Sequence, residues 1–178
     1  MFFKNFPAIP YDSLGNYNFK EVTNLLRRII VRSKVKTNTL MFDTYDVRDG
    51  ETPEMLADKL YDDPELHWVI LMMNDITDRF HQWPMNSVQF NTYVEEKYSN
   101  INAIHHYEIA QSSGDTTTKI WVENDTDASA YSDATPITNY EYELREQDRK
   151  RKIRLLDPRY LDQFVQEFQT KMRESIIC

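Results

Sequence analysis

The chain has 178 residues, enough for one ordinary domain or for a compact core with appendages. Its formal charge is −8 at pH 7 and its sequence pI is near 5.0, which argues against a protein that binds nucleic-acid phosphates non-specifically. The single cysteine, Cys178, excludes an intramolecular disulfide and fits a reducing compartment.

The N-terminal segment, residues 1–17, mixes large apolar side chains with prolines. Prolines at this density prevent a regular helix or a central strand, and they interrupt the segment before a signal peptide could form. The longest unbroken apolar run, residues 68–73, is too short to cross a bilayer. We expect a soluble protein that stays in the cytoplasm and whose N-terminus is either frayed or an extended arm that docks on a partner.

After the arm, apolar residues recur at helical spacing from Phe19 to Ile30, and a β-branched, alternating stretch follows. This pattern predicts a short helix that gives way to a strand near Ile29. Extended structure is expected to continue through residues 40–47. The arginines and lysines of residues 27–36 are expected on a solvated face, with docking onto an acidic protein as the alternative.

Three helix starts share one signal, a small polar capping residue followed by proline at the first helical position. They are Thr52-Pro53, Asp63-Pro64 and Asp157-Pro158. A fourth start is predicted at Asn86, because Gln89 three residues later completes a capping box.

The second of these helices is apolar nearly all round at residues 68–73, which predicts burial on more than one side. Asn74 is expected to end it in the left-handed conformation that asparagine tolerates. The side chains that we expect to be buried are Trp68, Val69, Leu71 and Met72.

Two hairpins are expected in the last third of the chain. The first pairs residues 105–110 with residues 119–123, and the second pairs residues 137–144 with residues 150–156. The acidic connector between them, residues 123–139, is expected to be a surface loop. The chain is expected to end in an amphipathic helix, with an apolar stripe of Leu161, Phe164, Val165, Phe168, Met172 and Ile176.

No constellation for catalysis, a cofactor or a metal emerges from the sequence. The three glycines are far apart, so they cannot form a phosphate-binding loop. His105 and His106 are neighbours on a predicted strand and should point to opposite faces, so they cannot share a metal. A calcium loop in the acidic connector is rejected because Ala130 and Pro136 replace its turn glycine and its bidentate glutamate. Cys178 has no histidine nearby in the sequence, so we expect no nucleophile, no enzyme activity, no cofactor and no small-molecule substrate.

Residues 45–74 read as a strand, a glycine turn, two helices and an asparagine, and this order resembles the LysM module. The matching residues are Tyr45, Val47, Gly50, Thr52, the Leu56-Ala57 pair and Asn74. Glu51 stands where the family usually has aspartate, and Pro53 where it usually has leucine. The second strand of the family has no counterpart directly downstream, where residues 79–90 contain no glycine and lead into a further helix.

Two longer stretches, residues 49–75 and residues 140–168, resemble the small baseplate wedge proteins (wedge subunit 53) of T-even-like contractile-tailed bacteriophages. This resemblance implies a structural virion protein of the tail baseplate, present in the host cytoplasm during assembly. It further implies that the LysM-like unit serves assembly, and that the subunit joins a wedge and ties adjacent wedges around the hub. The partners are then other baseplate wedge proteins and neighbouring wedges, not nucleic acid or a membrane.

Under this interpretation, exposed aromatic side chains are the candidate partner contacts. On the arm they are Phe2, Phe3 and Phe6. Trp83 lies on the loop after the LysM-like helices, and Tyr140 and Tyr142 lie on the strand after the acidic connector. Ordinary core packing is the alternative for Trp83, Tyr140 and Tyr142.

The LysM resemblance leaves open an alternative function, the binding of peptidoglycan. Most LysM modules bind N-acetylglucosamine polymers in a groove beside the first turn and the loop after the second helix. In this chain the corresponding residues are Gly50, Glu51, Thr52 and Asp75.

The expected fold is α+β, with three regions. Residues 1–42 form an N-terminal arm with a helix and a strand, and residues 43–100 form the LysM-like strand-helix-helix core. Residues 101–178 form the C-terminal hairpins and a docked amphipathic helix.

Overall fold

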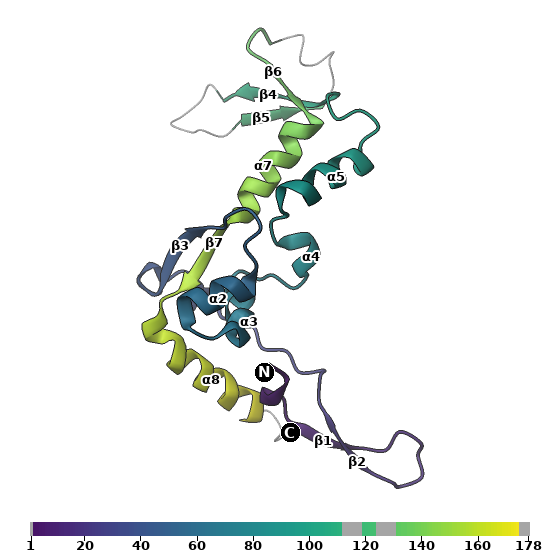
Figure 1. The fold of residues 1–178 in the computed structure, drawn as a ribbon, viewed down its shortest axis with the longest axis vertical. Coiled ribbons are helices and arrows are strands. Elements are labelled where there is room, and N and C mark those ends of the chain that lie inside the picture. Colours follow the sequence, from purple (N-terminus) through teal and green to yellow (C-terminus); the bar gives the residue numbers. More distant parts are fainter. Residues whose placement is uncertain (1, 112–118, 124–130, 175–178) are drawn as a thin grey trace. The chain divides into compact units, whose positions relative to one another are not determined.

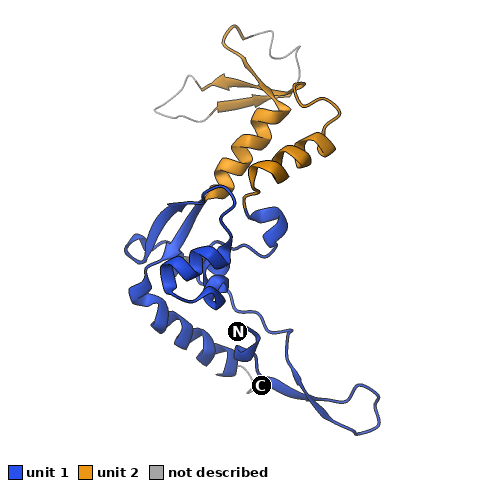
Figure 2. Cartoon of the chain, in the orientation of Figure 1, with its two compact units in different colours: residues 1–83, 152–178 blue, residues 84–151 orange. Residues whose placement is uncertain are grey.

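The computed structural model describes residues 2–111, 119–123 and 131–174, and its fold is α+β, as the sequence predicts (Figure 1). The chain forms two compact units (Figure 2). The first unit consists of Met1–Trp83 with Lys152–Cys178, and the second unit consists of Pro84–Arg151. The second unit is thus inserted in the sequence of the first, and the expected C-terminal region of residues 101–178 is shared between them.

The centre of the first unit is a strand-helix-helix-strand arrangement. A turn at Gly50 and a short 3₁₀ helix connect its elements, which are β3 (Phe42–Asp46), α2 (Pro53–Tyr61), α3 (His67–Met73) and β7 (Lys152–Leu156). β7 pairs antiparallel with β3, with Tyr45 opposite Ile153. The strand that pairs with β3 therefore comes from beyond the inserted second unit in the sequence.

The predicted helix starts are confirmed. The side chains of Thr52, Asp63 and Asp157 accept hydrogen bonds from backbone N–H groups two or three residues later. Asn86 and Gln89 form both bonds of a capping box. Gly50 has a φ of +76°, which favours glycine in the turn before α2. These contacts are local, so the sequence alone specifies them.

α3 forms the middle of the core, with Val69 and Ile70 fully buried. The expected burial of Leu71 and Met72 is wrong, because both are only partly buried while Ile70 and Met73 take the inner positions. α2 and β7 cover one side of α3. A helix that is apolar all round does not show in its sequence which side its neighbours cover.

α8 (Leu161–Glu174) packs its apolar stripe against this core, and the Phe168 ring lies 4.6 Å from the Trp68 ring between centroids. Leu161, Phe168 and Met172 are buried, as expected, whereas the predicted contact of Ile176 falls outside the described residues. The stripe therefore completes the core around Trp68.

The helix expected between Phe19 and Ile30 is wrong. Two strands, β1 (Ala8–Tyr11) and β2 (Lys20–Thr23), form an antiparallel hairpin, and only one helical turn, α1 (Ser33–Lys36), precedes β3. A two-stranded ribbon has two free edges, so it tolerates Pro10. Pairing with β1 overrides the weak helical spacing of the segment.

In its described residues, the second unit combines two helices with a three-stranded sheet in the order β5-β4-β6. The elements are α5 (Ser87–Lys97), β4 (Ile104–Ala110), β5 (Lys119–Val122), β6 (Thr135–Thr138) and α7 (Asn139–Arg151). The first predicted hairpin is confirmed, with Ile109 opposite Ile120. Its turn at residues 112–118 and residues 124–130 of the acidic connector lie outside the described residues.

The second predicted hairpin is wrong, because residues 139–151 form the helix α7. The alternation of tyrosine and glutamate suggested a strand, but Glu, Leu, Arg, Gln and Lys are strong helix formers. The buried residues Asn139, Glu143 and Gln147 follow the four-residue spacing of a helix face. Tyr140 and Tyr142 therefore lie on a helix and not on a strand.

Asn74 joins α3 to β7 instead of adopting a left-handed cap. Its φ is −100°, and Asp75 is the residue with positive φ. The Asn74 amide donates to the carbonyl oxygens of Ile70 and Arg154, and its oxygen accepts from the N–H of Arg154, each at 2.8 Å. One side chain thus links the end of a helix to a strand 80 residues away in sequence.

We expect Asn74→Asp to lower the free energy of unfolding by about 2–3 kcal/mol, because a carboxylate oxygen would face two carbonyl oxygens where the amide now donates. Urea denaturation followed by circular dichroism measures the change. The exposed Asn91 on α5 offers a matched control, and Asn91→Asp should have little effect. Equal losses in the two variants would contradict this role of Asn74.

Candidate partner-binding surfaces

The turn between β3 and α2 is organised by Glu51. Its carboxylate accepts hydrogen bonds from the Tyr45 hydroxyl at 2.9 Å and the Arg48 N–H at 3.0 Å, and Lys59 lies 3.6 Å away. Burial alone would raise the pKa of Glu51, but these two hydrogen bonds and the charge of Lys59 lower it. The carboxylate is thus committed to holding its own turn.

Trp83 covers the same turn from the segment after α3. Its indole N–H donates to the backbone oxygen of Glu51 at 2.9 Å, and only 6% of the residue is exposed. Arg79 at the start of α4 (Arg79–Gln82) forms an ion pair with Glu54 on α2. Trp83 therefore packs in the core, which was the alternative to its role as a partner contact.

The four candidate sugar-binding residues are placed differently in the structure. Gly50 is exposed, and Glu51 and Thr52 are partly buried at the β3–α2 turn. Asp75 pairs with Lys36 and borders a groove that none of the other three residues lines.

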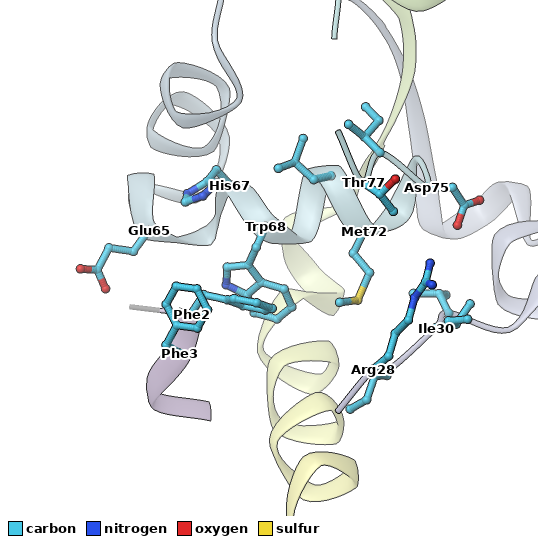
Figure 3. A pocket seen from close by; sticks show the side chains of 14 residues that line it. Phe2, Phe3, Arg28, Ile30, Glu65, His67, Trp68, Met72, Asp75 and Thr77 are labelled. Atoms are coloured by element: carbon cyan, nitrogen blue, oxygen red, sulfur yellow. The ribbon is translucent and has the colours of Figure 1, made fainter. Parts of the chain in front are cut away.

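This groove, the α3 groove, is a largely apolar hollow of about 720 Å³ (Figure 3). Its lining includes the partly exposed side chains of α3, the N-terminal aromatics and the segment that follows β2, with charged groups among them. The lining residues are Phe2, Phe3, Arg28, Ile29, Ile30, Val31, Glu65, His67, Trp68, Leu71, Met72, Asp75, Ile76 and Thr77. A hollow of this size and apolarity is suited to bind apolar side chains.

The three arm phenylalanines lie at one end of the first unit's core. Phe2 and Phe6 are partly buried, and the Phe2 ring lies 5.3 Å from the Trp68 ring. Phe3 remains 59% exposed at the groove. Only Phe3 of the three is therefore mostly exposed, and partner contact by all three stays a prediction.

The β1–β2 hairpin carries a second apolar surface, the hairpin tip, which we define as Leu14, Tyr17 and Phe19. These residues are 80%, 88% and 59% exposed. The Asp12 carboxylate accepts hydrogen bonds from the N–H groups of Leu14, Gly15 and Tyr17, at 3.1, 2.9 and 2.6 Å, and so fixes the loop. Desolvation alone would raise the pKa of Asp12, but the backbone hydrogen bonds together lower it.

In the second unit, the two candidate tyrosines of α7 contact other aromatic rings. Tyr142 stacks on His105 with 4.0 Å between ring centroids, and Tyr140, 36% exposed, lies 5.6 Å from Phe90. Both tyrosines are thus packed against another ring and also partly exposed. The structure does not decide between partner contact and core packing for them.

The expectation that His105 and His106 point to opposite faces is wrong. A register shift interrupts β4 between Ile104 and His106, and the two Nδ1 atoms lie 3.0 Å apart. A bulge places two successive residues opposite one partner residue, so the strict alternation of faces is lost. Nevertheless, within the described ranges 2–111, 119–123 and 131–174, no group of three or more His, Cys, Asp or Glu side chains could hold a metal ion.

Glu108 and His106 form the polar part of this cluster. Glu108 accepts hydrogen bonds from Lys119 at 2.8 Å and Arg145 at 2.7 Å, which outweigh its burial and lower its pKa to about 2. Burial lowers the pKa of His106, although Glu108 at 3.6 Å opposes the shift. The folded unit therefore favours neutral His106 beside ionised Glu108.

Glu143 on α7 was missed by the sequence analysis. It is 4% exposed and accepts hydrogen bonds from Lys97 at 2.6 Å and Tyr98 at 2.8 Å, so it joins α7 to the end of α5. The hydrogen bond to Glu143 raises the pKa of Lys97. The four-residue spacing of Asn139, Glu143 and Gln147 was the available signal, but a helix had not been predicted there.

None of the helices in the described part of the chain combines the length and the apolar character needed to span a bilayer.

Comparison with known proteins identifies the family. The family described as "Base plate wedge protein 53" matches residues 1–131. The chain belongs to the base plate wedge protein 53 family. A relative is the "Baseplate wedge protein gp53" of Enterobacteria phage T4, which is 22% identical over 187 residues covering 97% of this chain and 89% of the relative.

As a base plate wedge protein 53, the chain has a structural role in a bacteriophage tail baseplate. The matched span of residues 1–131 contains the hairpin tip and all the residues that line the α3 groove. The resemblance to the wedge proteins, drawn from residues 49–75 and 140–168, is thereby confirmed.

We expect Trp83→Phe to cost about 1 kcal/mol of stability, because it keeps the ring but removes the hydrogen bond to Glu51. Trp83→Ala should cost about 3–5 kcal/mol through the cavity that it leaves. Chemical denaturation measures both. Trp121→Phe is the matched control, since Trp121 is 53% exposed; if it cost as much as Trp83→Phe, the buried hydrogen bond would not be the cause.

We expect the stability of β4 to fall as the pH drops from 7.5 to 5.5. The pKa of His106 is lower in the folded than in the unfolded protein, so its contribution is present above the ordinary histidine pKa of about 6.5 and is lost on acidification. Hydrogen exchange of β4 amides, corrected for intrinsic rates, measures the slope of β4 stability against pH.

In His106→Gln the slope over this pH range should be flatter. His81→Gln, a change on α4 in the first unit, should leave it unchanged. The same slope in wild type and His106→Gln would show that another group is responsible.

Proposed function

We propose that this protein is a non-enzymatic wedge subunit that joins adjacent wedges around the hub of a contractile-tail baseplate through protein–protein contacts. Family membership and the T4 relative, a baseplate wedge protein, support the structural part of this proposal. The observation that carries the joining role is the combination of an exposed hairpin tip with an open apolar groove in one unit. Exposed apolar patches bounded by polar groups are typical of protein interfaces.

The hairpin supports the proposal independently. A two-stranded hairpin is marginally stable in water by itself, and all four residues of β2 are exposed. Large apolar side chains that contribute little to the fold of their own chain favour a partner that covers them. The partners in this proposal are other baseplate wedge proteins and neighbouring wedges, and not nucleic acid, a membrane or a small molecule.

In the same proposal the β3-α2-α3-β7 core is a LysM-like unit used for assembly. The alternative, peptidoglycan binding, is favoured by the same order of elements. Against it, Trp83 lies against the β3–α2 turn where a sugar groove needs open space, and Arg79 pairs with Glu54 in the first turn of α2. Asp75 borders a different surface. Titration with chitin oligomers, followed by NMR, separates the two functions. Saturable shifts confined to residues 50–52 and 75–78 would support the alternative.

Co-expression with the phage's other wedge proteins, followed by size-exclusion chromatography, tests the proposal. We expect co-elution that depends on the large wedge subunits, and partial loss of it in the double variant Leu14→Asn, Tyr17→Asn. Leu40→Asn is the matched control, because Leu40 is also 80% exposed but lies outside the tip and the groove. A wild-type monomer that elutes apart from every wedge protein would contradict the proposed function.

A further inference from the structure

A stretch between β2 and α1, residues 27–32, has the side-chain pattern of a strand, and we call it the wall segment. Exposed and partly buried side chains alternate along it. The exposed ones are Arg28, Ile30 and Arg32, and the partly buried ones are Arg27, Ile29 and Val31. An alternation with a period of two residues is typical of an extended chain that has one face on a core.

The backbone of the wall segment has no partner strand in the structure. Within the described ranges 2–111, 119–123 and 131–174, the N–H and carbonyl groups of residues 28–31 form no hydrogen bond. A row of unpaired backbone groups is a template to which a strand of another protein can be added.

The wall segment is held in place before a partner binds. Ile29 and Val31 pack against the core of the first unit, and the Arg27 guanidinium donates to the backbone oxygen of Met172 on α8 at 2.9 Å. Docking on a fixed edge costs less conformational entropy than docking on a loose loop. The wall segment is thus a preformed edge.

The wall segment borders the α3 groove. Residues 28–31 belong to the groove lining, and Figure 3 shows Arg28 and Ile30 on the side of the hollow opposite Phe2 and Phe3. A strand that pairs with the wall segment would place every second side chain toward the apolar groove. Its remaining side chains would lie beside the exposed row of the wall segment, because successive side chains of a strand point to opposite faces.

The wall segment lies in a strongly basic part of an acidic chain. Residues 22–42 contain five Lys and Arg and no Asp or Glu, a formal charge of +5, whereas the whole chain has a formal charge of −8. Two of these cations, Arg28 and Arg32, are exposed, and no side chain in the described part of the chain pairs with either of them. They are therefore available to the carboxylates of a partner.

The carboxylates at the groove already have other cations beside them. Asp75 pairs with Lys36. A hydrogen bond from the N-terminal amine, together with its charge, lowers the pKa of Glu65. An occupant that neutralises Arg28 and Arg32 therefore has to bring acidic groups of its own.

A protein segment fits this site better than a nucleic acid does. Leu71 and Met72 present partly exposed apolar side chains to the groove, and these offer no hydrogen bond to a phosphate. The formal charge of −8 also opposes the approach of a polyanion. A protein strand in which acidic and apolar residues alternate would match both the arginines and the apolar groove.

We propose that the α3 groove binds an extended segment of another baseplate wedge protein, in which acidic and apolar residues alternate and which pairs as a strand with residues 28–31. Its apolar side chains enter the groove, and its carboxylates lie beside Arg28 and Arg32. The inference deepens the proposed function and rests on it, since it names the surface and the chemistry of one wedge contact.

Hydrogen exchange tests the strand pairing, with the full chain measured alone and in the complex co-expressed with the large wedge subunits. Amides of residues 28–31 should exchange fast in the isolated chain. In the complex alternate amides should become protected about tenfold or more, because successive N–H groups of a strand point to opposite sides. Protection already present in the isolated chain would mean that the chain covers its own edge. That result, or unchanged exchange in the complex, would overturn the inference.

Charge reversal tests the acidic character of the occupant. Arg28→Glu should bind the large wedge subunits about tenfold more weakly, because like charges would then meet, and it should fold normally because Arg28 is exposed. Lys152→Glu is the matched control, since it reverses an exposed cation on β7 that does not line the groove. Titration of the subunits with each variant measures the affinity, and equal affinities of the two variants would contradict an acidic occupant.

The apolar part of the contact has a matched pair of its own. Ile30→Asn should weaken binding to the large wedge subunits, whereas Leu40→Asn should not, because Leu40 is also exposed but lies outside the groove lining. Equal binding by Ile30→Asn and wild type would show that the groove is not filled by apolar side chains of the partner, and the inference would fall.

These results are distinguishable from the fate of the proposed function. If Arg28→Glu and Ile30→Asn co-elute with the large wedge subunits like wild type, the groove is not the contact and the wedge function stands. If Arg28→Glu instead loses binding to single-stranded DNA or to vesicles of anionic lipid, the basic wall serves a polyanion or a membrane surface and the inference is wrong. If wild type itself elutes apart from every wedge protein, the proposed function fails, and this inference fails with it.

Discussion

The pairing of β3 with β7 is the constraint on which the first unit depends. The two strands are separated in the sequence by the whole second unit, yet they meet in one register and give α2 and α3 a common surface. Asn74 connects the end of α3 to β7 through three hydrogen bonds. α8, which follows β7 in the sequence, packs on Trp68. α3 contributes to the lining of the α3 groove, and its contacts with α2 and β7 hold it in place. Apolar burial of this kind provides most of the driving force of folding.

This construction separates the parts that stabilise the protein from those available to partners. Trp68 and Trp83 are almost completely buried, one beneath α8 and one against the β3–α2 turn. The hairpin tip and the groove, by contrast, present apolar surface that the chain itself leaves uncovered. The proposed wedge-joining role needs this division, because a surface that binds a partner has to be stable before the partner arrives.

The charged side chains also fall into two groups, those paired inside a unit and those exposed to solvent. Glu108 and Glu143 are held inside the second unit by lysine, arginine and tyrosine donors, so their charges serve local packing. Most acidic side chains of residues 37–83 are instead exposed, while the N-terminal 36 residues are basic. Exposed charges at this density are screened by salt over about 10 Å. They therefore contribute little to the stability of the fold.

The sequence by itself determined the features that are local or that depend on composition. Caps at Thr52, Asp63, Asn86 and Asp157, the glycine turn, the amphipathic α8 and the family resemblance follow from residues within a few positions of one another or from a continuous pattern. Tertiary structure decided the rest. In the tertiary structure Ile70 and not Leu71 is buried, and residues 139–151 form a helix. A bulge in β4 places the side chains of His105 and His106 next to each other, and β7 pairs with β3. Tertiary structure also placed Trp83 on the turn and left the hairpin tip uncovered. In each of these cases the deciding energy comes from a neighbour distant in the sequence, which a local pattern does not contain.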